Sequence, residues 1–434
     1  MKHHVVFTQH QLFAIDLSKH IDGKLGRYML YSPLARDFVE LEANELDDLE
    51  QQLSEKGRFD NDALQQKLIG QRLEPTDNYV SSPKHVYAMT ILPNNICNFA
   101  CSYCYAAQGH GHDELSDEAL KTVIDFFVDA KRTKRKDLYL SVGGGGEPMI
   151  SWKKFKYAVE YSDSLAQQQG LTIHYSYASN GSIIDDDIIQ TIKQHNIKAN
   201  ISFDILEDVQ NTQRRNYDKV CATLDRMLSN DIIPTINAVI TPLNVTRQEE
   251  MVKEVHRRFP KLKRLSFDEV IDSQLFDNTE DLKRFYNDYT DHFFHARRLG
   301  RTYGIDVNSI KYHELGTLKS RACGGGFDVT PQGTISVCFL VSSPKEPLYD
   351  DFVYGRIADG KVIVDDDKFK RLVEGSANHR QQCRNCFVKW HCGGGCLYNT
   401  TSYSKQQQDA LCDFKRHFSL LGLLEKHHED AQPQ

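Results

Sequence analysis

Three cysteines lie within eleven residues in the segment ICNFACSYCYA, which spans residues 96–106. They are Cys97, Cys101 and Cys104, with the spacing C-x3-C-x2-C. A structural zinc site uses four protein ligands and leaves no coordination position open. Three thiolates with no fourth nearby therefore indicate a metal centre with one position free for another molecule. A zinc site, or three cysteines without a common role, are the alternatives.

Most of the remaining cysteines lie in the last quarter of the chain, at Cys323, Cys338, Cys383, Cys386, Cys392, Cys396 and Cys412. In a long chain without a secretory signal, metal binding or catalysis explains such residues better than disulfides do. Cys221 stands alone in DKVCATLDRML, at a position typical of the buried face of a helix, and we interpret it as a core residue.

The composition is that of an ordinary globular protein, with 434 residues, 40% hydrophobic and 26% charged. A net charge of -7 gives no electrostatic reason to expect nucleic acid or an anionic membrane as a partner. We interpret the basic run at 131–136 as a solvated helix end. No segment approaches the ~20 apolar residues of a membrane span, and the N-terminus lacks a signal-peptide pattern. We therefore expect a cytoplasmic protein.

From His85 to about residue 300, strand and helix patterns alternate. Strands are predicted at 85–92, 138–142, 173–179, 198–205, 233–240 and 262–271. Such alternation predicts a parallel sheet with helices on its faces, and six units fit a partial or complete barrel. The chemistry of such folds lies at the carboxyl ends of the strands. The cysteine loop, GGGGEP (143–148), SNG (179–181) and SFD (202–204) all follow strands there.

Two other segments flank this barrel, which we assign to residues 85–300. Residues 1–80 predict a small α+β unit, with strands at 5–9, 12–17, 28–32 and 37–42 and a helix at 43–55. Residues 301–425 are rich in cysteine and glycine, with hairpins predicted at 333–342 and 352–364. Residues 426–434 are expected to form a disordered tail.

The cysteine triplet, with Tyr103 before its last cysteine and GGGGEP following the second strand, resembles the radical SAM enzymes. The resemblance implies that the three thiolates hold a [4Fe-4S] cluster whose fourth iron chelates S-adenosyl-L-methionine. The cofactor is then cleaved to a 5′-deoxyadenosyl radical that takes a hydrogen atom from a substrate. It assigns Tyr103 to shielding the cluster, and cofactor contacts to Gly144, Gly145, Gly146, Glu147, Asn180, Ser202 and Arg214. Taken singly, Asn180, Ser202 and Arg214 are equally compatible with ordinary surface polar residues.

The seven later cysteines have the spacing C-x9-G-x4-C, then C-x2-C-x5-C-x3-C, then Cys412, and resemble the SPASM domain. That resemblance implies two auxiliary four-iron clusters, with an outer ligand set of Cys383, Cys386, Cys392 and Cys412 and an inner set of Cys323, Cys338 and Cys396. Some relatives have another cysteine shortly before the position of Cys323. Its absence here leaves an iron of the inner cluster open, or ligated by His313. Two zinc ribbons are the alternative.

SPASM enzymes mostly modify peptides or proteins. Some crosslink peptides through thioether or carbon–carbon bonds, and others convert a sulfatase residue to formylglycine. The latter typically carry an aspartate directly after the second SPASM cysteine, where this chain has Phe339. Residues 1–80 resemble, by pattern alone, the winged-helix module to which a leader peptide adds a strand; a capping subdomain is the alternative. We interpret His110 and His112 as residues of a solvated loop near the mouth of the barrel.

These observations predict a radical SAM/SPASM maturase with three [4Fe-4S] clusters and S-adenosyl-L-methionine, acting on a ribosomally made precursor peptide. Flavodoxin or ferredoxin is the expected external electron donor, and neither nucleic acid nor a membrane is an expected partner. The first alternatives are sulfatase maturation and maturation of a quinone-bearing enzyme subunit. A zinc-bound scaffold without catalysis is the alternative from another class of protein. The sequence does not identify the peptide, the residue attacked or the oligomeric state.

Overall fold

A computed structural model of the chain describes residues 3–7, 11–18, 23–76, 80, 82–271, 275–375 and 381–431. It divides into two compact units. The barrel unit comprises residues 79–309 and 325–375, and the terminal unit comprises residues 1–78, 310–324 and 376–434. The first 78 residues thus belong to the same unit as the cysteine-rich C-terminal segment, rather than forming a unit of their own.

Seven consecutive parallel strands form the main sheet of the barrel unit: β5 (Ala88–Ile91), β6 (Asp137–Val142), β7 (Thr172–Ser179), β8 (Lys198–Ser202), β9 (Thr235–Ile240), β10 (Arg264–Glu269) and β11 (Asp306–Asn308). The first six are the predicted strands, so the predicted α/β fold with a parallel sheet is confirmed. β11 was not predicted; three residues are too few to show a periodic pattern.

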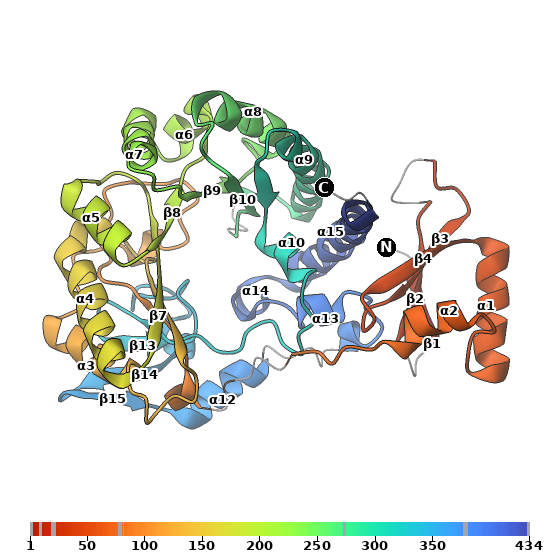
Figure 1. Cartoon of the computed structure of the whole chain (residues 1–434), viewed down its shortest axis with the longest axis horizontal. Coiled ribbons are helices and arrows are strands. Elements are labelled where there is room, and N and C mark those ends of the chain that lie inside the picture. Colours follow the sequence, from red (N-terminus) through yellow and green to blue (C-terminus); the bar gives the residue numbers. More distant parts are fainter. Residues whose placement is uncertain are drawn as a thin grey trace. The chain divides into compact units, whose positions relative to one another are not determined.

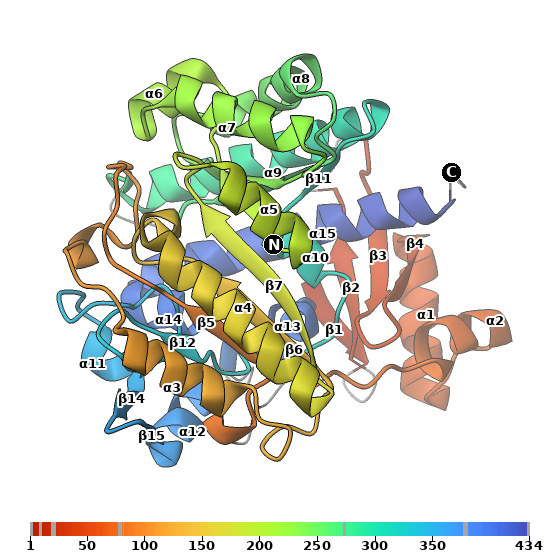
Figure 2. The same ribbon diagram turned by 60° about the vertical axis from the view of Figure 1, so that its left-hand side comes forward.

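Helices connect these strands and lie along the outer side of the sheet, as Figures 1 and 2 show. They are α3 (Asp117–Phe127), α4 (Trp152–Gln169), α5 (Asp186–Gln194), α6 (Glu207–Gln213), α7 (Tyr217–Ser229), α8 (Gln248–Arg258) and α9 (Thr279–Thr302). Ser116 caps α3 as predicted, since its hydroxyl accepts a hydrogen bond from the backbone N–H of Ala119. Cys221 is buried on α7, which agrees with a core position.

The sheet continues beyond β5 through four short strands, in the order β12 (Asp328–Val329), β13 (Thr334–Ser336), β14 (Val353–Ala358) and β15 (Lys361–Val364). β12 is parallel to β5, and the other three pair antiparallel with their neighbours. The short helices α11 (Tyr349–Phe352) and α12 (Asp366–Gly375) complete the barrel unit. Residues 325–375 therefore extend the same sheet that carries the cysteine loop.

In the terminal unit, β1 (His3–Phe7), β2 (Leu12–Asp16), β3 (Arg27–Ser32) and β4 (Asp37–Glu42) form an antiparallel sheet in chain order. Helices α1 (Ala43–Lys56) and α2 (Asp62–Gln65) follow it, and the segments from later in the chain add α10 (Ile310–Glu314), α13 (Lys389–Cys392), α14 (Leu397–Ser402) and α15 (Lys405–Ala431). α15 includes most of the segment for which we predicted a disordered tail, because Leu420, Leu423 and Leu424 on it pack into a hydrophobic core.

Both faces of this small sheet are buried. Leu12, Ala14 and Leu30 pack with the leucines of α1, whereas Phe13 and Ile15 on the opposite face pack with Phe387, Val388 and the leucines of α15. Side chains of a strand alternate between the two faces, so a strand buried on both faces carries a continuous apolar run. The sheet is thus the middle layer of the terminal unit.

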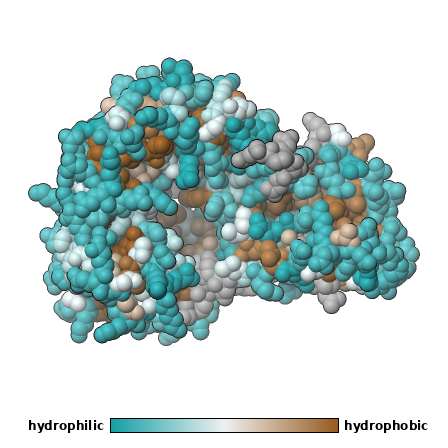
Figure 3. Space-filling model, in the orientation of Figure 1, coloured by the Kyte–Doolittle hydropathy of each residue, from teal (hydrophilic) through white to brown (hydrophobic). Residues whose placement is uncertain are grey.

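No helix among the described residues is both long and apolar enough to cross a membrane. Hydrophilic residues cover most of the face seen in Figure 3, and hydrophobic residues appear there as smaller patches.

Candidate active site

The loop that follows β5 carries Cys97, Cys101 and Cys104. All three are free, partly buried thiols. Burial raises the pKa of each thiol, that of Cys101 to about 11, and the negative charges of the neighbouring Cys97 and Cys104 contribute to that rise. Thiols that raise one another's pKa lie close enough to share a metal centre, where bound iron replaces the proton. The donor set therefore fits a [4Fe-4S] cluster with three cysteine ligands.

A network of buried polar side chains holds the cysteine loop in place. The Tyr103 hydroxyl donates to both carboxylate oxygens of Asp204, at 2.9 and 2.8 Å, and Nη1 of Arg214 donates to the Tyr103 oxygen at 3.0 Å. Asp204 is fully buried, and burial raises the pKa of its carboxyl group. Among the described residues, Nε of Arg214 is buried without a hydrogen-bond partner. This donor fits the role of receiving an anionic group of a bound cofactor.

The glycine loop after β6 packs directly against the cysteine loop. Gly146 N–H donates to the Asn94 carbonyl at 3.1 Å, and Glu147 N–H donates to the Ile96 carbonyl at 2.8 Å. A Cβ atom at Gly146 would lie 2.3 Å from both Asn94 Oδ1 and the Ile96 oxygen, so only glycine fits there. Gly144 and Gly145 have φ of +90° and +70°, which side chains disfavour. The cysteine loop and the glycine loop are therefore joined by backbone hydrogen bonds and closely packed against each other.

Glu147 joins the ends of β6 and β7. Its carboxylate accepts hydrogen bonds from the Asn180 N–H at 2.6 Å, the Ser179 hydroxyl at 2.8 Å and the Met149 N–H at 3.0 Å. It is 2% exposed, and burial raises the pKa of the carboxyl group while these three bonds lower it. Both carboxylate oxygens are thus occupied by protein donors, and the side chain fixes the position of the glycine loop.

Asn180 and Ser202 lie at the ends of β7 and β8. Nδ2 of Asn180 donates to Asn98 Oδ1 at 2.9 Å and lies 3.9 Å from Cys97 Sγ. Ser202 is the last residue of β8 and is partly buried. The structure therefore connects the cysteine loop, Tyr103, the glycine loop, Asn180 and Arg214 through hydrogen bonds, and places Ser202 on the neighbouring strand end.

Sequence reasoning missed two residues of this site. Asp204 is the last residue of the SFD motif, in which we assigned a role only to the serine; the motif itself carried the signal. His110 is partly buried, with Nε2 3.9 Å from Cys104 Sγ, and burial lowers its pKa. His110 was interpreted as part of a solvated loop near the mouth of the barrel, and it is partly exposed there; the contact of its ring with Cys104 is what the sequence did not indicate. His112 is exposed as expected. The position of His110 six residues after Cys104 gave no local signal of that contact.

A second group of cysteines lines a pocket in the terminal unit, formed by Cys383, Cys386, Cys392, Cys396 and Cys412. The pocket also has basic walls, with Lys389, Lys415 and Arg416 among its residues. Nζ of Lys415 lies 3.4 Å from Cys392 Sγ, and within the described part of the chain Nε of Arg416 is buried without a partner. Four of these cysteines are the predicted outer set, and thiolates facing buried cations fit an iron–sulfur cluster of net negative charge.

The predicted inner set is divided between the two units. Cys323 and Cys396 belong to the terminal unit. Cys338 belongs to the barrel unit and lies two residues after the end of β13. His313 lies in α10 of the terminal unit. The inner ligand set remains a prediction.

Comparison with known proteins shows which protein families and enzymes this chain is similar to. Residues 91–255 match the Radical SAM superfamily. The chain is 24% identical over 360 residues to the serine-type anaerobic sulfatase-maturating enzyme of Klebsiella aerogenes, covering 77% of this chain and 84% of that protein. It is 22% identical over 413 residues to the radical SAM cyclopropyl synthase TigE of Paramaledivibacter caminithermalis, covering 86% and 81% of the two chains.

Two solved structures share the fold. Native anSMEcpe with bound AdoMet and Kp18Cys peptide matches with a TM-score of 0.63 at 17% identity, covering 79% of this chain and 99% of that chain. Streptococcus suis SuiB bound to the precursor peptide SuiA matches with a TM-score of 0.51 at 14% identity, covering 87% and 94%. At such identities the similarity establishes the fold.

Proposed function

This chain carries a radical SAM domain and is related to the anaerobic sulfatase-maturating enzymes, and on that basis we propose that it is a cytoplasmic maturase of a ribosomally made peptide. The observation that carries the proposal is the contact between the loop of Cys97, Cys101 and Cys104 and the glycine loop ending at Glu147. A cluster site and a cofactor site are thereby combined at the carboxyl ends of adjacent strands.

The chain's own residues bind and orient the reactants in this proposal. When bound, a reduced [4Fe-4S] cluster and S-adenosyl-L-methionine supply a 5′-deoxyadenosyl radical, which takes a hydrogen atom from the substrate. Tyr103 and Asp204 hold the cysteine loop in place, and the free N–H of Arg214 is available to the cofactor's carboxylate. Glu147 fixes the glycine loop, so that its backbone can approach the methionyl group without rearrangement.

A peptide substrate is supported by the relatives. The structures of anSMEcpe and SuiB each contain a peptide, and their shared fold with this chain makes a peptide the natural first substrate to test. Forming a thioether or carbon–carbon crosslink removes two hydrogen atoms from the peptide. The radical takes one, and the other leaves as a proton and an electron. We propose that the SPASM cysteines would hold auxiliary clusters, which would supply an acceptor for that electron, and that flavodoxin or ferredoxin would be the external electron donor.

The N-terminal sheet is the proposed site for a leader peptide. Its strand order leaves β1 and β4 at the edges, and an extended peptide can add a strand to such an edge. Both faces of the sheet are buried, so we expect a leader peptide to bind along one of its edge strands.

Formylglycine formation is a second candidate, favoured by the similarity to the Klebsiella aerogenes enzyme over 84% of its length. Against it, Phe339 follows Cys338 where the family's pattern has an aspartate. Phe339 is 45% exposed, and its ring packs against that of Tyr105 with ring centres 6.1 Å apart. A sulfatase-type peptide that gains an aldehyde, trapped with a hydrazine, would establish this activity.

The first test is the cluster inventory of anaerobically reconstituted protein. Three four-iron clusters predict roughly twelve irons per chain, and about eight in a variant with Cys97, Cys101 and Cys104 changed to alanine. Cys221→Ala is the matched control and should retain all the iron. Reduced wild-type protein should convert S-adenosyl-L-methionine to 5′-deoxyadenosine, and the triple variant should not. Bound zinc in place of iron, or full iron content in the triple variant, would reject the proposal in favour of a binding scaffold.

A further inference from the structure

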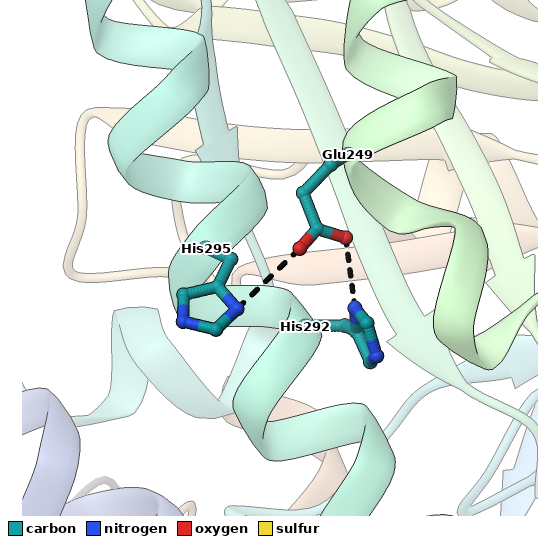
Figure 4. A group of neighbouring side chains, drawn as sticks. All are labelled: Glu249, His292 and His295. Atoms are coloured by element: carbon teal, nitrogen blue, oxygen red, sulfur yellow. Dashed lines mark hydrogen bonds and ion pairs between the residues drawn. The ribbon is translucent and has the colours of Figure 1, made fainter.

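Two helices of the barrel unit present a cluster of potential metal ligands that the proposed activity does not use. Glu249 lies in the first turn of α8, and His292 and His295 lie on α9. One ligand atom from each side chain lies within 4.8 Å of the other two. Figure 4 shows both imidazole rings turned toward the same carboxylate.

The three side chains converge in an ordered way. His292 Nδ1 lies 2.9 Å from Glu249 Oε2, and His295 Nδ1 lies 3.4 Å from Oε1. Each ring nitrogen thus faces a different oxygen of one carboxylate. The two rings are nearly perpendicular, at 87°, with centres 6.3 Å apart. One ligand atom of each of the three groups is therefore near enough to the other two for all three to meet a single ion.

The two helices form a rigid support for these ligands. Residues three apart on a helix share a face, which explains why His292 and His295 point in the same direction. Phe293 and Phe294 between them are 0% and 3% exposed and anchor α9 in the core. Met251 and Val252 anchor α8 in the same way. The ligand positions are therefore set by packed elements, as metal sites require.

The site is open to solvent on one side. The side chains of Glu249, His292 and His295 are 26%, 30% and 57% exposed. An ion can therefore enter from water, and a water molecule can complete its coordination.

We propose that Glu249, His292 and His295 bind a divalent ion of the zinc type, with water as the fourth ligand. Two imidazole nitrogens and one carboxylate oxygen suit zinc and its neighbours in the transition series, whereas magnesium and calcium select oxygen ligands. Three protein ligands with one open position make a tetrahedral zinc site. The ion links α8 to α9, which flank β10, and this binding is independent of the cluster chemistry.

The competing explanation is a plain ion pair between helices. A single histidine satisfies such a pair, and His292 at 2.9 Å already does so. The second histidine, at 3.4 Å from the other oxygen, adds little as a hydrogen bond but supplies the third ligand of a metal site. The two explanations differ in one measurable respect, because only the metal site makes stability depend on zinc.

The test uses the full-length, cluster-loaded protein dialysed anaerobically against buffered Zn²⁺, with zinc and iron measured in the same sample. We compare wild type with Glu249→Gln and His295→Ala. The matched control is His174→Ala, which removes a histidine that is 44% exposed and paired with Asp137 at 2.8 Å, and which belongs to no group of three potential ligands within the described part of the chain. Wild type and control should each retain one zinc per chain more than the two variants. Iron should be equal in all four proteins.

Thermal unfolding gives the second measurement. Zn²⁺ should raise the Tm of wild type and of the His174→Ala control, and leave that of the Glu249→Gln and His295→Ala variants unchanged. Equal zinc content in all four proteins, or an equal response of their Tm to Zn²⁺, would overturn the proposal and leave the ion pair. Equal iron throughout keeps this result separate from the cluster inventory, which tests the proposed activity.

Discussion

Nζ of Lys415 donates to Sγ of Cys392 across 3.4 Å, at the wall of the cysteine pocket in the terminal unit. Burial by itself lowers the pKa of Lys415, but the charges of Cys392, Glu314 and Cys396 raise it overall, so the ammonium group remains charged. A buried positive charge beside a cluster favours the reduced, more negative form.

Replacing that charge should lower the reduction potential of the outer auxiliary cluster. For Lys415→Met we expect a decrease on the order of 100 mV or less, since one charge at this distance is removed from a partly desolvated site. A redox titration followed by electron paramagnetic resonance measures the potential. Lys405→Met, which removes an exposed lysine near Asp409, should leave the potential unchanged. An unchanged potential in Lys415→Met with full iron content would mean that the pocket holds no cluster beside this lysine.

Gly146→Ala should disrupt cofactor binding. The added methyl group would lie 2.3 Å from Asn94 Oδ1 and from the Ile96 carbonyl, so the two loops must move apart, at a cost of about 1–3 kcal/mol. We expect loss of S-adenosyl-L-methionine binding in equilibrium dialysis, with most of the iron retained. Gly170→Ala is the control for backbone strain away from the site, because φ there is +67° but a methyl group meets no atom within 4 Å, and cofactor binding should be retained. Normal binding by Gly146→Ala would show that the glycine loop does not contact the cofactor.

Asp328 predicts a pH dependence of stability. Burial raises the pKa of its carboxyl group to about 7, with hydrogen bonds from Thr90 and the Phe339 backbone partly opposing the rise. A pKa above the unfolded value of 3.8 means that the folded protein binds the proton more tightly. The contribution is fully present below about pH 4 and is lost as the pH rises through 7.

Asp328→Asn should therefore remove this loss. Relative to the variant, wild type should lose about 4 kcal/mol of stability between about pH 4 and pH 7, the interval between the unfolded and the folded pKa, and little more above pH 7. Chemical denaturation of both proteins at several pH values measures the difference. Parallel stability curves for the two proteins would show that the carboxyl group keeps an ordinary pKa.

The N-terminal sheet should be indispensable for the C-terminal cluster site. Phe13, Ile15 and Tyr31 share a core with Phe387 and with Cys386, one of the predicted ligands of the outer cluster. A chain lacking residues 1–76 should therefore lose the four irons of the outer cluster, falling from roughly twelve to about eight per chain if it remains folded. Phe387→Ala tests the same core in the full chain and should cost about 3–5 kcal/mol. Full iron content in the truncated chain would identify the first 76 residues as an independent module.

Local patterns predicted the elements well. The six strands of the barrel, the four N-terminal strands and the Ser116 cap follow from periodicity and end signals that each segment carries within itself. The extension of the sheet by β12 was not predicted, because two residues show no pattern and their partner β5 lies more than 200 residues earlier. The role of Glu147 in holding the loop depends on Ser179 and Asn180, which no local signal connects to it.

The assignment of the N-terminal sheet to a unit with the C-terminal segment was also missed, although the sequence contains a hint. Leu12, Phe13, Ala14 and Ile15 form a continuous apolar run, and each is at most 1% exposed. Such a run is typical of a strand covered on both sides. It shows that a second layer exists but not which part of the chain supplies it, and here that part lies some 370 residues away.

That separation also affects how the protein is made. The N-terminal sheet leaves the ribosome early, while Phe387 and the leucines of α15 that cover its second face are synthesised last. At about 5–20 residues per second, the sheet waits for some tens of seconds with apolar side chains open to water. Yield in a host cell should therefore depend on chaperones that shield this face during translation, and a slowly translated codon run in the middle of the gene would prolong the exposure.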